Sequence, residues 1–167
     1  MIAFALTIFA GAFLLFEVQP LIAKFILPWF GGSPGVWTTC MLFFQVVLLA
    51  GYAYAHLVSR YLRPRTQAIV HGSLLVVATL LLPITPSASW KPVSSADPEP
   101  RILLLLAACV GIQGLVLAST GPLIQNWFTR TRPGVSPYRL YSLSNIGSLL
   151  ALLSYPFLIE PNLSRVH

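Results

Sequence analysis

The sequence predicts an all-α, polytopic integral membrane protein with five transmembrane helices and a cytoplasmic N-terminus. The first observation is composition: 56% of the 167 residues are hydrophobic and 8% are charged, against roughly 25% charged in soluble domains. The second is that the apolar residues form five runs, and the third is that arginines gather in two short loops between runs. A chain with so few charges cannot build a polar shell, so we expect lipid to be its main solvent.

The net charge of +6 does not indicate a nucleic-acid partner. Basic residues at the ends of membrane helices explain it, and no basic patch is interleaved with aromatics. Cys40 and Cys109 fall inside apolar runs without a CxxC pair, so we interpret them as small apolar side chains. No Lys or Arg precedes Lys24, which favours a retained first helix over a cleaved signal peptide.

We expect the chain, 1–167, to form a single membrane domain. Its helices are predicted at approximately 3–28, 35–58, 67–84, 102–128 and 138–159, each near or above the roughly 17–25 residues that cross a bilayer. The third run is short. The segment 85–100 is rich in Pro and Ser and is predicted to be an irregular, solvent-exposed loop.

Arginine positions set the predicted orientation. With the N-terminus inside, the loop after the second helix and the loop after the fourth helix both face the cytoplasm, as the positive-inside rule requires. These two loops carry Arg60, Arg63, Arg65, Arg130, Arg132 and Arg139. The opposite side holds Lys91, Arg101 and Arg165, diluted by acidic residues.

Small residues recur along the last two long runs, where they allow close helix contact. On each run the small residues form one face, which we call its smooth face. Because the runs are consecutive and antiparallel, we predict that the two smooth faces pack against each other. The residues are Ala107, Gly111, Gly114, Ala118 and Gly121 in one run and Ser144, Gly147, Ser148, Ala151 and Ser154 in the other.

Three polar side chains, those of Glu17, Gln45 and Gln113, lie about ten to thirteen residues from the outer helix ends, near the bilayer midplane. An ionised carboxylate at that depth costs at least about 2.5 kcal/mol, so Glu17 should be protonated, paired or in a hydrated cavity. We expect the two glutamines as hydrogen-bond partners. Lys24 lies two turns further along and could point outward or toward Glu17.

Pro20 should kink or break the first helix just after Glu17. Two interpretations of Glu17 stay open: a site for a proton, a cation or a cationic substrate, or a buried acid that holds helices together. For Asn145, a helix-packing role is the simpler interpretation.

His56 and His71 would stand at similar depth in a helical hairpin, which is a possible arrangement for a haem or metal ion. Ordinary interfacial histidines are commoner, and no further ligand is nearby in the sequence. We therefore predict no cofactor, with this pair as the one alternative. No hydrolase, nucleotide-binding or dinucleotide-binding motif occurs.

The strings "GAFLLFEVQPLIAKFILPWFGGSPGVWTTCMLFFQVVLLAGYAYAH", "TGPLIQNWF" and "SPYRLYSLSNIGSLLALLSYPFLIEP" resemble the N-terminal membrane part of bacterial fused major-facilitator/spermidine-synthase-like proteins. The resemblance implies a partial major-facilitator-like half in a bacterial inner membrane, followed in the family by a soluble aminopropyltransferase-like domain. It also implies an acid in the first helix and an Asn-Gly pattern in the fifth, matched here by Glu17 and by Asn145 with Gly147.

The chain departs from that family where the sequence ends, at His167, before a sixth helix or a catalytic domain. We therefore expect a fragment or a stand-alone membrane module without catalytic residues of its own. Three functions stay open: an accessory or structural subunit of a larger membrane complex, a transporter-like or substrate-channelling domain, and the membrane half of a spermidine-synthase-like enzyme. The expected partners are lipid and either other membrane subunits or a missing C-terminal domain.

Overall fold

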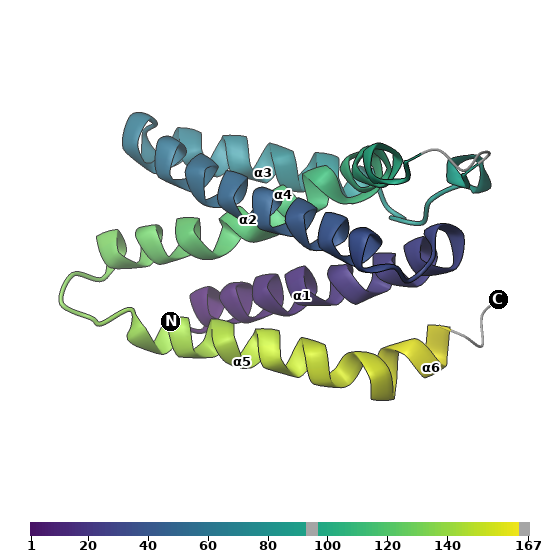
Figure 1. The fold of residues 1–167 in the computed structure, drawn as a ribbon. Helices are drawn as coiled ribbons and strands as arrows, with labels where there is room; N and C mark the ends of the chain where they lie inside the picture. Colours follow the sequence, from purple (N-terminus) through teal and green to yellow (C-terminus); the bar gives the residue numbers. More distant parts are fainter. Residues whose placement is uncertain (93–96, 164–167) are drawn as a thin grey trace.

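The computed structural model describes residues 1–92 and 97–163, and in this part of the chain every regular element is helical (Figure 1). Four helical stretches are long and apolar enough to cross a membrane: α1, α2, α4 and the continuous run Tyr138–Asn162. The long helices are α1 (Ile2–Phe30), α2 (Pro34–Tyr61), α3 (Pro64–Leu80), α4 (Glu99–Thr131) and α5 (Tyr138–Ser154). Three short elements complete the set: η1 (Ala88–Trp90), the π-helical turn η2 (Tyr155–Ile159) and α6 (Glu160–Leu163).

Local chemistry explains where the helices start and stop. Gly31 ends α1 with φ 83°, a conformation that favours glycine, and its N–H donates to Leu27 O. The Ser33 side chain accepts from the N–H of Val36 at 3.4 Å and so caps α2, whose first residue is a proline. A proline also opens α3, at Pro64.

The bundle is built around α1 and α4. Helices α2 and α3 pack on α4, and α5 packs on α1, so that α5 forms one edge of the bundle (Figure 1). The largest apolar core lies where the end of α1 meets the start of α4, around the fully buried Ile26, Ile102 and Leu106. Most other apolar side chains on the long helices face outward, as expected for helices solvated by lipid.

The predicted pairing of the two smooth faces is wrong. Two small residues of α4 meet α2: a Cβ added at Gly51 of α2 would lie 2.6 Å from Ala118 Cβ, and one added at Gly114 would lie 3.0 Å from the Val47 side chain. Those of α5 meet α1, because a Cβ at Gly147 would lie 2.8 Å from Phe9 O. Sequence spacing identified the smooth faces, but it could not say which neighbour each one faces, since any helix can approach a small residue closely.

Of the predicted kink or break at Pro20, the break does not occur. Helix α1 continues through both Pro20 and Pro28 to Phe30. The predicted loop is irregular in its described part, yet it is not simply exposed. Pro86 is buried, and Arg101 donates to the carbonyls of Ser89 and Trp90 at 2.9 and 3.0 Å. Residues 93–96 of this loop, and Arg165, lie outside the described residues.

The two arginine-bearing loops lie at one end of the bundle, together with the N-terminus (left in Figure 1). A hydrogen bond joins the helix ends beside these loops, because Arg130 Nη2 of α4 donates to the carbonyl of Ser59 of α2 at 3.0 Å. The α1–α2 turn and the α3–α4 connection lie at the other end (Figure 1). The structure therefore agrees with the prediction that both arginine-bearing loops lie at one end of the bundle.

Candidate functional site

Glu17 lies in the contact between α1 and α5. It is 9% exposed, and its Oε1 accepts a hydrogen bond from Ser154 Oγ at 2.9 Å. The other carboxyl oxygen, Oε2, is buried and has no hydrogen-bond partner within the described residues. Ser154 Oγ also lies 3.1 Å from the carbonyl of Ala151, so one hydroxyl proton serves two acceptors. The acid is therefore held by protein but incompletely satisfied.

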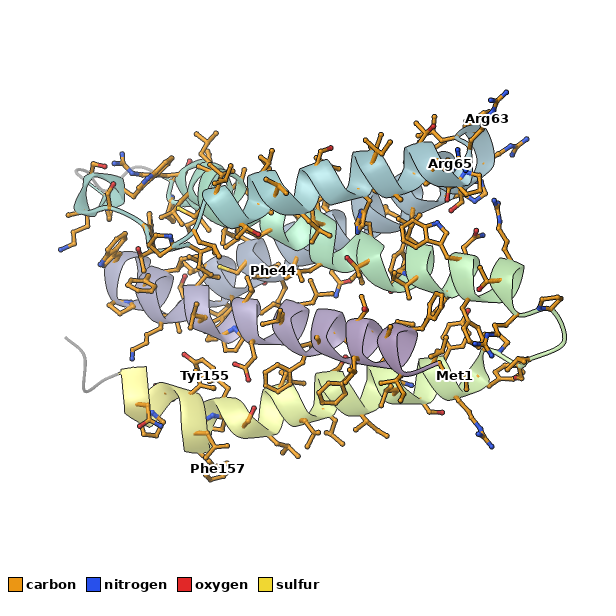
Figure 2. All side chains as sticks on the ribbon, turned by 180° about the vertical axis from the view of Figure 1, so that it is seen from behind. Met1, Phe44, Arg63, Arg65, Tyr155 and Phe157 are labelled. Carbon is orange, nitrogen blue, oxygen red and sulfur yellow. The ribbon has the colours of Figure 1, made fainter. Side chains whose placement is uncertain are left out.

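A second polar contact joins α1 to the π-helical turn η2 that follows α5. Tyr155 Oη donates to the carbonyl of Pro20 at 3.1 Å, and Figure 2 shows Tyr155 directed toward α1 while Phe157 points away from the bundle. Tyr155 opens the π-helical turn, which also contains Pro156. Because proline offers no N–H, it disturbs the regular ladder of the helix here. Wide turns of this kind are frequent at functional sites.

A crevice runs along α1 between α2 and α5, formed by two hollows of about 490 and 550 Å³. Leu15, Phe16 and Leu48 line both hollows and form an apolar neck between them. The hollow toward the α1–α2 turn has the polar residues Gln19, Lys24, Gln45, Tyr155 and Glu160 in its wall. The hollow toward the arginine loops has Tyr52, Gln125, Tyr141, Ser144, Asn145 and Ser148.

The structure does not gather the predicted polar residues into one cluster. Gln45 is exposed and lines the first hollow together with Lys24, and Asn145 is exposed in the second. Gln113 is buried in α4 and makes no hydrogen bond to Glu17. The expected glutamine partners of Glu17 are thus replaced by Ser154, which the sequence marked only as a small residue.

The two histidines are not brought to a common site. His71 is buried, and its Nε2 lies 3.1 Å from Thr120 Oγ1, with its ring 6.1 Å from that of Tyr54. His56 is exposed on α2, about 200° around the helix from Tyr54. Among the described residues, no three side chains of His, Cys, Asp or Glu gather as metal ligands.

Gln67 was missed by sequence reasoning and is fully buried. Its Nε2 donates to the carbonyl of Leu62 at 2.8 Å, and its Oε1 accepts from Trp127 Nε1 at 2.7 Å. The side chain thereby caps the end of α2 and ties it to α4. Nothing in the local sequence indicates a partner sixty positions away.

Comparisons with protein families, with curated proteins and with solved structures give no match.

Proposed function

We propose that this chain is an accessory or structural module of a larger membrane assembly, with no catalytic centre of its own, and that another membrane-spanning body covers the crevice between α2 and α5. The proposal is supported above all by the exposed amides of Gln45 and Asn145 in that crevice. Polar side chains at membrane depth face protein or water, because hydrocarbon offers them no hydrogen bonds.

The packing of α5 supports the same proposal. This helix rests on α1, and the window that best suits a membrane span in Tyr138–Asn162 is 11% buried. Leu149, Leu152 and Leu153 are among its exposed side chains. A helix at the edge of the bundle that packs mainly on α1, with Leu140 also reaching Phe128 of α4, leaves a broad face for a second membrane-embedded surface.

We propose five crossings, although α3 has only 17 residues, fewer than the roughly 20 of an average span. Helices α2 and α4 run in the same direction (Figure 1). If both cross the bilayer, the chain must return across it between them, and α3 is the only helix of that length in between among the described residues. Apolar residues continue to Ile84 and lengthen the path.

Site-specific photo-cross-linking in native membranes tests the assembly. A photoreactive residue at Gln45 or at Asn145 should yield adducts with another membrane protein or a second copy of this chain. Ile69, 70% exposed on α3 and away from the crevice, is the matched control and should react with lipid. Lipid adducts alone at all three positions would overturn the proposal.

A transporter-like or substrate-channelling domain is the second candidate. It is supported by the two polar hollows on either side of the apolar neck at Leu15, Phe16 and Leu48. A conduit predicts that single cysteines at Gln45 and Asn145 react with hydrophilic thiol reagents from opposite sides of the membrane. If both positions are inaccessible to such reagents while cross-linking succeeds, the crevice is a protein interface instead.

The sequence resemblance adds a third proposal: a partial major-facilitator-like half that serves a spermidine-synthase-like enzyme in a bacterial inner membrane. The strings around Glu17 and Asn145 support it. A soluble aminopropyltransferase-like domain found in complex with the chain would support it further. A complete assembly that contains no such domain would contradict it.

A further inference from the structure

We infer that the arginine-bearing end of the bundle is a binding site for the phosphate headgroups of anionic phospholipids. The inference starts from charge. The two loops at this end carry six arginines, all exposed: Arg60, Arg63, Arg65, Arg130, Arg132 and Arg139. Arginine is charged at every physiological pH, so this end is permanently cationic.

No acidic side chain balances these charges at the same end of the bundle. The acidic residues of the chain number 4, and the structure describes all of them. Glu17 lies at the α1–α5 contact, Asp97 and Glu99 precede or open α4, and Glu160 follows the π-helical turn. These positions are within the bundle or at its opposite end (Figure 1). The compensating anions must therefore come from outside the chain.

The fold concentrates the arginines instead of spreading them over the surface. The Arg130–Ser59 hydrogen bond fixes the end of α4 against the end of α2, which brings the two loops together. Figure 2 shows Arg63 and Arg65 extending from the α2–α3 turn, at the same end as Met1. Within the described part of the chain, the guanidinium groups of four of these residues make no ion pair or hydrogen bond and are therefore available: Arg63, Arg65, Arg132 and Arg139.

The chemistry of this end suits a lipid phosphate better than a free anion. Guanidinium groups bind phosphate oxygens in a bidentate manner, and basic sites beside membrane helices recognise anionic headgroups. Tyr61 at the end of α2 and Tyr138 at the start of α5 are 70% and 76% exposed beside these loops, and aromatic residues of this kind sit at the level of the headgroups. A headgroup held by arginines would keep its acyl chains along the apolar helix faces.

Native mass spectrometry of the full chain, released from mixed-lipid nanodiscs, tests the inference. We expect phosphatidylglycerol or cardiolipin to be retained at least tenfold more than phosphatidylcholine. Joint replacement of Arg63, Arg65, Arg132 and Arg139 by Gln should abolish that preference. Equal retention of anionic and zwitterionic lipids by the unmodified chain would overturn the inference, as would an unchanged preference in the Gln variant.

Two further arms make the result specific. Replacing the same four residues by Lys keeps the charge but loses the bidentate geometry. We therefore expect the preference of the Lys variant for anionic lipid to be weaker than that of the unmodified chain and stronger than that of the Gln variant. Inorganic phosphate at millimolar concentration should not displace the lipid, and displacement would assign the site to a free anion. Because all four side chains are exposed, the Gln and Lys variants should keep the melting temperature of the unmodified chain, which is measured alongside.

Discussion

Glu17 has one hydrogen bond where an ionised carboxylate accepts several. Ser154 supplies that bond, and Oε2 is buried without a partner in the described structure. Both residues come from helices that also share the Tyr155–Pro20 contact. At the scale of single residues, these polar links add to the packing of small residues between α1 and α5, and each link can be tested by removing one partner.

The Glu17–Ser154 bond should appear as a coupling energy. We expect Glu17→Ala and Ser154→Ala each to lower the free energy of unfolding in detergent. The double variant should lower it by less than the sum of the two single effects. The expected coupling is about 0.5–2 kcal/mol, the range for hydrogen bonds between membrane helices and for bonds to charged groups. Ser148→Ala combined with Glu17→Ala is the control pair and should be additive, since Ser148 bonds within α5 instead. Additivity in both pairs would contradict the bond.

Among the polar side chains, Gln67 is the one whose replacement should lower the free energy of unfolding most. Gln67→Leu leaves the Leu62 carbonyl and the Trp127 N–H without their partner, and each unsatisfied buried group costs about 1–3 kcal/mol. We expect a lower melting temperature and altered Trp fluorescence. Gln125→Leu, a half-buried residue in the wall of the second hollow, is the matched control and should change stability by less than about 1 kcal/mol. Equal losses of stability in Gln67→Leu and Gln125→Leu would mean that side-chain shape matters more than the hydrogen bonds.

At the scale of helices, close approach between α2 and α4 depends on Gly51. A Cβ there would lie 2.6 Å from Ala118 Cβ and 3.1 Å from the backbone N of Ser119. Gly51→Ala should therefore force the helices apart and cost about 1–3 kcal/mol. Gly72→Ala on α3, where no heavy atom lies within 4 Å, should be neutral or stabilising, because alanine favours the helix. Thermal unfolding in detergent measures both, and a stabilised Gly51→Ala variant would refute the contact.

Helix positions could be predicted from the sequence, whereas helix partners could not. Apolar run length and terminal signals such as Ser33-Pro34 are local, so the predicted segments overlap α1 to α5. Helix α3 begins at Pro64, three residues before the expected start, since proline favours the first helical position. The partner of Gly147, or that of Glu17, depends on how distant helices dock, and no periodicity within one helix contains that information.

At the scale of the whole molecule, the direction in which each helix runs determines at which end of the bundle the arginines lie. Five antiparallel elements place two arginine loops and the N-terminus at one end. A four-crossing arrangement, with α3 outside the bilayer, would separate the ends of α2 and α4 that the Arg130–Ser59 bond joins. The proposed arrangement of five crossings keeps these two helix ends on one side of the membrane.

Thiol labelling distinguishes the two arrangements. In a background of Cys40→Ala and Cys109→Ala, single cysteines replace exposed residues at Thr66, Ser136, Gly32 and Ser87. With five crossings, a membrane-impermeant maleimide should label positions 66 and 136 from one side of the membrane and positions 32 and 87 from the other. Positions 66 and 136 should be protected in intact cells, because arginine-rich loops stay inside. Labelling of 66 and 87 from the same side would show that α3 does not cross. In that case α2 and α4 could not both span the bilayer in the same direction. The crevice between α2 and α5 would then not lie within the bilayer along its whole length.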